Sequence, residues 1–265
     1  MNDEQYTIEY LDVEKLIPRE KDFKETGGAI YLVLGATGSG KTNIIKSLLI
    51  SKSFFIPVTI ACSASEDMNG NYSKIIPDLF VYNDYTKEIW NKLKTRQLIA
   101  KDQLDNPLIQ VVYDDIMTKT KNMGDQKEFF TNSRQYMITG YIASQGVFDL
   151  DPQLRDQIAG VFIMRTNNET QRSKIYKNFA SEIPNEKLFN SIMDSITTDY
   201  GALFIDKKDT SDNWINKVKW FKAFDKEILK QNISVVSKDV LAFHDERYNK
   251  TYNSKESLLK NLKNL

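Results

Sequence analysis

Cysteine, histidine and proline are scarce in this chain of 265 residues, which holds one cysteine, one histidine and six prolines. A single cysteine, Cys62, excludes a disulfide within the chain, and its apolar surroundings predict a small core residue. The one histidine, His244, has no second histidine and no cysteine cluster at metal-ligand spacing around it, so we expect a structural role for it. A disulfide-stapled fold and a zinc site of clustered histidines and cysteines are therefore excluded.

Long hydrophobic runs are also missing. No apolar stretch approaches the roughly 18 residues that a membrane-spanning helix needs. The first five residues, Met-Asn-Asp-Glu-Gln, are acidic and lack the basic-then-apolar layout of a signal peptide. We therefore expect neither a secretion signal nor a membrane span, and a lone cysteine is compatible with a reducing compartment.

Net charge is absent as well, because 36 basic residues balance 36 acidic ones. The whole molecule is therefore not a general electrostatic attractant for nucleic acid. From Asn216 to the end, however, 11 Lys and Arg residues stand against 6 Asp and Glu residues. Such a run is typical of a solvated helix face, and it is also the best place to expect contacts with a phosphate backbone.

The chain is long enough for one sizeable α/β core, and its hydrophobic content of 41% is ordinary for a globular protein. It contains no internal repeat, no linker rich in proline and serine and no low-complexity block. We predict one core with short additions: an N-terminal extension over residues 1–28, an α/β core over 29–221, and a basic helical tail over 222–265.

The most informative segment is a G-x-x-x-x-G-K-[ST] motif between a short apolar run, 29–34, and a run with helical spacing, 43–50. A strand, a glycine-rich turn and a helix N-terminus together form an anion site, because backbone N–H groups and the helix dipole point into the turn. This context disfavours the alternative of a plain glycine turn with an exposed lysine. We predict that the motif binds the phosphates of ATP. The predicted ATP-binding residues are Gly35, Ala36, Thr37, Gly38, Ser39, Gly40, Lys41, Thr42 and Asn43.

Alternating patterns along the chain predict an α/β fold. Apolar, β-rich runs predict strands at 29–34, 54–62, 79–82, 108–115, 136–145, 158–164, 202–206 and 214–221. Helical periodicity predicts helices after the glycine-rich motif, at 85–104, at 124–134 and in two stretches between 168 and about 197, and we expect 67–72 to be a loop. Strands that alternate with helices indicate a mainly parallel sheet covered on both faces.

Polar side chains end two further strands of this sheet, and ligands bind at the carboxyl ends of strands in open α/β sheets. Asp114 is predicted to hold Mg²⁺ through its water shell, opposite the Thr42 hydroxyl, while Lys41 reaches the β- and γ-phosphates. Asp115 is the candidate for polarising the attacking water. Gln145 can donate to the γ-phosphate and accept from that water. The alternatives are a carboxylate pair that begins a turn and an amide that merely ends a strand.

Phosphoryl transfer depends on charge neutralisation, so a second cation is expected beside Lys41. We choose Arg134, which lies 11 residues before Gln145 and can act as an arginine finger in a neighbouring subunit of a ring. Arg155 and Arg165 are the rivals. The alternative for Arg134 is an exposed charge at a helix end.

Together these motifs resemble those of the genome-packaging ATPases of large double-stranded DNA viruses, the vaccinia type, within the HerA–FtsK superfamily. The resemblance covers about 29–206, and its carriers lie at 34–42, 112–115, 132–134, 143–145 and 149–155. It implies a RecA-like, magnesium-dependent ATPase core that assembles as a homo-oligomeric ring, pentameric or hexameric, and pumps double-stranded DNA into a preformed capsid. It also implies capsid or portal-vertex partners, a location in the virion or at a cytoplasmic assembly site of the host, and a finger role for Arg134.

The sequence departs from the superfamily in two places. Many members carry Asp-Glu where this chain has Asp114 and Asp115, although the viral branch also has Asp-Asp. The chain also lacks an appended DNA-binding domain such as a winged helix, so the residues that contact DNA are not assigned.

Two other functions remain alternatives. A P-loop nucleotide kinase of this size usually carries an arginine-rich lid, and no such cluster follows Gln145. A nucleotide-binding assembly switch would need no hydrolysis, and the intact set of Asp114, Asp115 and Gln145 argues against a dead site.

Overall fold

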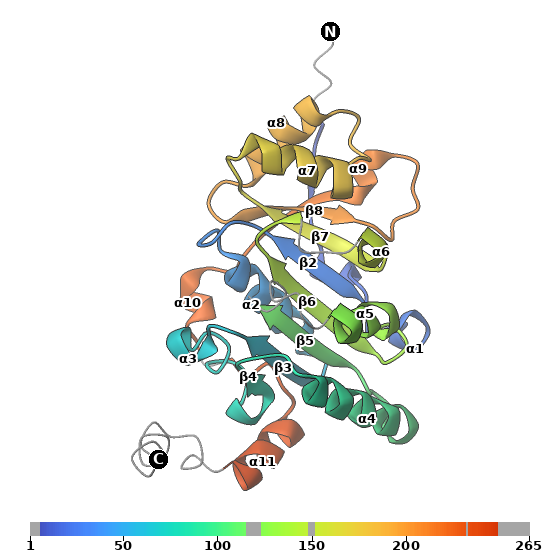
Figure 1. Ribbon diagram of the computed structural model, residues 1–265, viewed down its shortest axis with the longest axis vertical. Helices are drawn as coiled ribbons and strands as arrows, with labels where there is room; N and C mark the ends of the chain where they lie inside the picture. The colour runs from blue at the N-terminus through green and yellow to red at the C-terminus, as the bar shows by residue number, and fades with distance from the viewer. Residues whose placement is uncertain (1–5, 115–122, 148–151, 232, 249–265) are drawn as a thin grey trace.

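The computed structural model of the chain describes residues 6–114, 123–147, 152–231 and 233–248. Within them, nine strands form one sheet in the order β1-β9-β8-β7-β2-β6-β5-β3-β4, with helices on both sides (Figure 1). The strands are β1 (Glu9–Tyr10), β2 (Ile30–Leu34), β3 (Val58–Ser63), β4 (Val81–Tyr82), β5 (Ile109–Asp114), β6 (Ile138–Ser144), β7 (Ile158–Met164), β8 (Gly201–Asp206) and β9 (Val218–Lys222). Only the pairs β7–β8 and β8–β9 are antiparallel, so the predicted mainly parallel sheet is confirmed.

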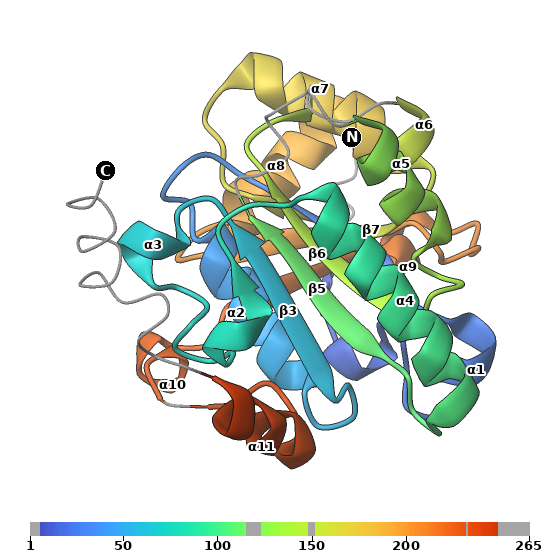
Figure 2. The same ribbon diagram turned by 60° about the horizontal axis from the view of Figure 1, so that its bottom comes forward.

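The helices lie in two layers. They are α1 (Phe23–Thr26), α2 (Lys41–Lys52), α3 (Glu66–Asn69), α4 (Lys87–Gln103), α5 (Met123–Asn132), α6 (Pro152–Arg155), α7 (Glu169–Phe179), α8 (Glu186–Ile196), α9 (Trp214–Lys217), α10 (Lys226–Leu229) and α11 (Lys238–Arg247), with short 3-10 turns at Val13–Lys15 and Asp78–Phe80. In Figure 2, α4 and α5 cross one face of the sheet while α2 lies behind it.

Alternate residues of the central strands pack against the helices on opposite faces of the sheet. Ile30, Leu32 and Leu34 of β2 belong to the core cluster that includes apolar residues of α4, α5, α7 and α8. Tyr31 and Val33 belong to the cluster on the α2 side. Strands buried on both faces need a nearly continuous apolar run, which is why the sequence pattern located them.

Several predicted boundaries shift. β3 begins at Val58 rather than at 54, because Phe55 and Ile56 pack with Leu108 in a separate small cluster. The predicted strand at 214–221 splits into α9 and β9, and the predicted strand at 79–82 is a 3-10 turn followed by the short β4. The predicted loop at 67–72 instead contains most of α3, which ends where Gly70 takes a left-handed φ of 53°.

Both ends of the described chain pack onto the sheet. β1 pairs with β9, and Leu11, Val13 and Leu16 are buried in the cluster on the α2 side. Val235 is also buried there, and its backbone N–H donates to the Ile75 carbonyl at 3.0 Å. The predicted extension and tail therefore contribute core contacts, and the division at 28/29 and 221/222 stays a prediction. Among the described residues, no helix has the length and apolar character needed to cross a bilayer.

Candidate active site

The sheet order brings three polar strand ends to one edge. β2, β6 and β5 are neighbouring parallel strands, with Leu34 in register with Ser144 and Tyr113 in register with Ile142. The segment after β2, the last residue of β5 and the segment after β6 therefore lie at the same carboxyl edge. The backbone N–H of Gly35 donates to the Ser144 carbonyl at 3.1 Å, which joins the first and third of these ends.

The segment from Gly35 to Gly40 forms a tight loop that ends at the N-terminus of α2. Gly38 and Gly40 take left-handed φ values of 77° and 97°, which side chains rarely adopt. A Cβ on Gly35 would lie 2.4 Å from Ser39 Oγ and 2.7 Å from Met164 Cβ, so only glycine fits there. The glycines therefore permit a tight loop that leads directly into the N-terminus of α2, the kind of position at which helices bind phosphate.

Lys41 is the first residue of α2, and its side chain is buried against this loop. Its ammonium donates to the Gly35 carbonyl at 2.7 Å and to the Ala36 carbonyl at 3.0 Å. The positive charge is thus held inside the turn where the sequence predicts the phosphates.

Asp114 lies across the edge from α2 and is buried. Its Oδ2 accepts hydrogen bonds from the Thr42 hydroxyl at 3.2 Å and from the Tyr72 phenol at 2.8 Å. A hydroxyl and a carboxylate in contact are the hard oxygen donors that Mg²⁺ prefers, and Mg²⁺ usually takes its remaining ligands from water and substrate phosphates. No cluster of three or more metal-ligating side chains occurs within the described ranges. The donor set at Thr42 and Asp114 therefore fits a magnesium ion held together with nucleotide.

Tyr72 is a site residue that the sequence did not identify. Burial raises the pKa of its phenol well above the ordinary value, and the nearby Asp114 charge raises that pKa further, so the phenol stays a proton donor. The loop that carries it is fixed by the buried Glu66 carboxylate, which accepts backbone N–H groups of Asn71, Tyr72 and Ser73 at 2.8–3.1 Å. A tyrosine in a polar-looking loop gives no pattern from which this contact could be inferred.

The structure describes some of the remaining predicted site residues and not others. Gln145 directly follows β6 and is exposed. Asp115 lies outside the described residues, as does part of the 149–155 segment. Arg155 ends α6 and donates to Asn178 Oδ1, while Arg165 is exposed after β7, on the loop beside Gly35 to Gly40.

Arg134 lies at the opposite edge of the sheet, before β6. Its carbonyl accepts the N–H of Gly28 at 3.2 Å and its Nε donates to the Thr26 carbonyl at 3.0 Å, both just before β2 begins. The five residues of β2 separate this edge from the glycine-rich loop by about 16 Å at the usual strand rise. The structure therefore does not bring Arg134 to the phosphate loop of its own chain.

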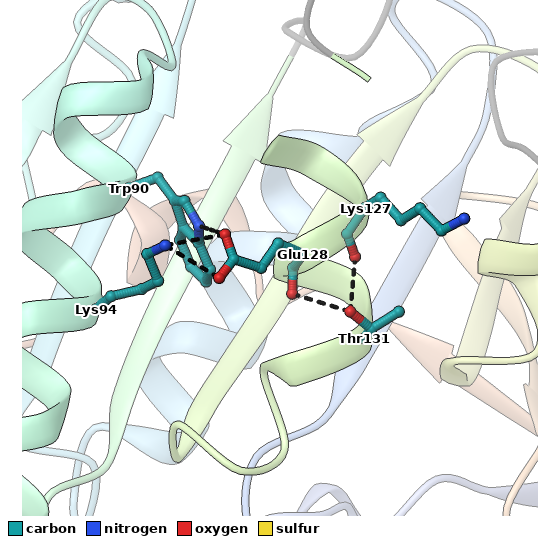
Figure 3. A network of polar contacts seen from close by, with 5 residues as sticks. All are labelled: Trp90, Lys94, Lys127, Glu128 and Thr131. Carbon is teal, nitrogen blue, oxygen red and sulfur yellow. Dashed lines mark hydrogen bonds and ion pairs between the residues drawn. The ribbon is translucent and has the colours of Figure 1, made fainter. Parts of the chain in front are cut away.

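The helix that leads to Arg134 is anchored to its neighbour. Glu128 of α5 accepts from the Trp90 indole at 2.7 Å and from the Lys94 ammonium at 2.9 and 3.0 Å, both on α4 (Figure 3). These contacts fix α5 across the sheet face and so fix where the chain turns into Arg134.

Comparison with known proteins gives close viral relatives and more distant structural ones. No family model matches the chain. It is 38% identical to uncharacterized protein 015R of frog virus 3 (isolate Goorha), over 83% of this chain and 70% of that protein. It is 36% identical to uncharacterized protein 088R of invertebrate iridescent virus 3, over 82% of this chain and 84% of that protein.

Among solved structures, one similar chain is the genome-packaging NTPase B204 of Sulfolobus turreted icosahedral virus 2 in complex with ATPγS. The two are 19% identical, and they align over 74% of this chain and 97% of that one at a TM-score of 0.52. The RecA-like P-loop ATPase fold implied by the resemblance is confirmed.

Proposed function

The chain belongs to the viral family of frog virus 3 protein 015R, and on this premise we propose that it is an ATP-hydrolysing motor. The motor would move double-stranded viral DNA into a preformed capsid. One observation carries the proposal: Lys41, Thr42 and Asp114 meet at one sheet edge, in the fold of a packaging NTPase.

The chemistry follows from the residues at this edge. Amides of the 35–42 loop and the Lys41 ammonium would bind the β- and γ-phosphates, because both supply positive charge in a partly water-excluded turn. Thr42 and Asp114 would hold Mg²⁺, which neutralises charge on the phosphate oxygens when bound. Asp115 would polarise the attacking water, and Gln145 would contact that water and the γ-phosphate.

Arg134 would act in a neighbouring subunit. The separation of about 16 Å from its own phosphate loop excludes a role within one chain, whereas a head-to-tail ring places one edge of each subunit against the next. A pentameric or hexameric ring would then complete each site with a second cation.

For the partners, we propose regions of the chain and classes of molecule rather than individual contacts. The excess of basic residues counted from Asn216 to the end supports contacts between DNA phosphates and this end of the chain, whose described residues include α10 and α11. Capsid or portal-vertex proteins are the proposed partners, at a viral assembly site or in the virion. The division into an extension, a core and a tail belongs to the same proposal.

The test is the ATPase rate with and without double-stranded DNA, measured beside the mass of the assembly, with Lys41→Ala as the inactive control. We expect DNA to raise the rate and to favour a ring, and we expect salt to reduce this effect steeply because backbone contacts release counterions. Normal turnover by Lys41→Ala would remove the P-loop assignment. Phosphoryl transfer to a nucleoside monophosphate would support a kinase, and bound ATP without phosphate release would support a switch.

A further inference from the structure

A pocket of about 640 Å³ opens directly beside the glycine-rich loop. One wall is the loop itself, residues 36–39. The other walls are the segment after β7 with the start of α7, and the turn that joins α8 to β8. Its lining residues are Ala36, Thr37, Gly38, Ser39, Arg165, Thr166, Asn167, Asn168, Gln171, Thr197, Asp199, Tyr200 and Gly201.

The aromatic side chain in this pocket is Tyr200, and it reaches the phosphate loop. A Cβ on Gly40 would lie only 2.8 Å from Tyr200 Cδ1, so the ring packs against the loop backbone at the start of α2. Tyr200 is nevertheless 44% exposed as a residue. A large aromatic side chain is thus held at the mouth of the phosphate site rather than buried in the core.

The backbone that presents Tyr200 is strained. Asp199 and Tyr200 take φ values of 47° and 61°, in the left-handed region that non-glycine residues seldom occupy. The turn is closed by the Gly201 N–H, which donates to the Thr198 carbonyl at 2.9 Å, and by an ion pair between Asp199 and Lys222. Strained residues persist where the surrounding structure fixes them, and they gather at ligand sites.

One buried polar group adds to the case for a ligand. Ser39 Oγ is buried and has no hydrogen-bond partner among the described residues, although it belongs to the pocket wall. The Lys226 ammonium lies 5.5 Å from the centroid of the Tyr200 ring and is not part of the pocket lining, so it supports the ring from outside the pocket.

We propose that this pocket holds the base and ribose of the nucleotide, and that the base stacks on the ring of Tyr200. The inference rests on the proposed function, because the 35–42 loop must bind the phosphates of the same molecule. Stacking depends on the area of the base rather than on its hydrogen-bonding edge, so purine triphosphates are favoured over pyrimidine triphosphates. Tyr200 is thereby the residue that sets this preference.

The experiment compares ligands with and without a base on the full-length protein in magnesium buffer. Affinities for ATPγS, CTP and inorganic tripolyphosphate are measured by calorimetry for wild type, Tyr200→Ala, Tyr200→Phe and Lys41→Ala. We expect Tyr200→Ala to weaken ATPγS binding about 5- to 150-fold, the range that base–aromatic stacking gives on alanine substitution. The same variant should bind tripolyphosphate within about twofold of wild type, and its preference for ATPγS over CTP should shrink. Tyr200→Phe keeps the ring and should behave as wild type.

The outcomes separate this inference from the proposed function. Lys41→Ala should weaken ATPγS and tripolyphosphate alike, because it removes a phosphate contact. If Lys41→Ala abolishes ATPγS binding while Tyr200→Ala leaves it unchanged, the phosphate site stands and the base lies elsewhere. Equal losses of ATPγS and tripolyphosphate in Tyr200→Ala would mean that the ring only supports the loop, and would overturn stacking. Failure of wild type to bind either ligand would overturn the proposed function and this inference together.

Discussion

Tyr72 donates a hydrogen bond to Asp114 across 2.8 Å, from the loop after β3 to the last residue of β5. The Thr42 hydroxyl donates to the same carboxylate oxygen. Two hydrogen-bond donors therefore fix the position of Oδ2 of Asp114. Through Tyr72, the loop that Glu66 holds is in direct contact with the proposed magnesium site. A partner such as the Tyr72 phenol orients a metal-binding carboxylate without touching the metal.

The first prediction concerns this contact. Tyr72→Phe should raise the magnesium concentration needed for half-maximal ATPase about 10-fold, because Asp114 loses the donor that orients it. The matched control is Tyr141→Phe, since Tyr141 is equally buried and its hydroxyl has no hydrogen-bond partner within the described part of the chain. A magnesium titration of the ATPase rate decides the matter, and equal curves for the two variants would contradict the role of Tyr72.

The site was predictable where a local pattern encodes the geometry. Gly35, Gly40 and Lys41 lie in a contiguous motif, and the apolar runs of β2, β5 and β6 are long enough to place their carboxyl ends at one edge. Tyr72 and Tyr200 were not predictable, because their roles depend on loops that fold back over many residues.

Edge strands and turns were the weaker part of the fold prediction. β4 has two residues, which is too short for periodicity to show. The apolar positions of the one-turn helix α9 continue directly into β9, so the sequence pattern did not locate the start of that strand. The antiparallel pairing of β8 depends on contacts with β7 and β9 that no local pattern contains.

A second prediction concerns Arg134. Because Arg134 lies at the edge away from its own phosphate loop, Arg134→Ala and Lys41→Ala subunits should complement each other in one ring. Each variant alone should lose about 10³-fold or more in rate, as removal of an arginine finger does. At equal mixing, about a quarter of the sites in a head-to-tail ring would join an intact loop to an intact Arg134. Co-purification of an untagged variant with the tagged other variant verifies co-assembly, and mixed rings without recovered turnover would count against the finger.

A third prediction concerns Lys52, which is buried at the end of α2. Its ammonium donates to the Leu16 and Pro18 carbonyls at 2.8 and 3.0 Å, and burial lowers its pKa from 10.5 to about 8. Between pH 8 and 10.5 the unfolded chain therefore keeps a proton that the folded chain has released. The free energy of unfolding should rise with pH in this window, by up to about 1.4 kcal/mol per pH unit.

Urea unfolding of wild type and Lys52→Met at several pH values between 7 and 10 isolates this contribution. Lys52→Met lacks the titrating group. The unfolding free energy of wild type minus that of Lys52→Met should therefore increase as pH rises above 8. Lys92→Met is the control, because the exposed Lys92 pairs with Glu88 and its pKa is raised instead. A difference that stays constant with pH for Lys52→Met would show that the amine titrates normally.

The last prediction separates two glycines of the phosphate loop. Gly38 and Gly40 both have left-handed φ values, so alanine at either position costs about 1–2 kcal/mol of backbone strain. Only at Gly40 does the new Cβ meet a side chain, Tyr200, whereas the space around Gly38 is open. Gly40→Ala should therefore weaken tripolyphosphate binding more than Gly38→Ala. Adding Tyr200→Ala should recover part of the loss at Gly40 and none at Gly38, with a coupling energy of about 0.5–3 kcal/mol. Calorimetry on wild type, Tyr200→Ala, the two glycine variants and the two double variants measures this coupling. Equal behaviour at both glycines would mean that the ring does not press on the loop.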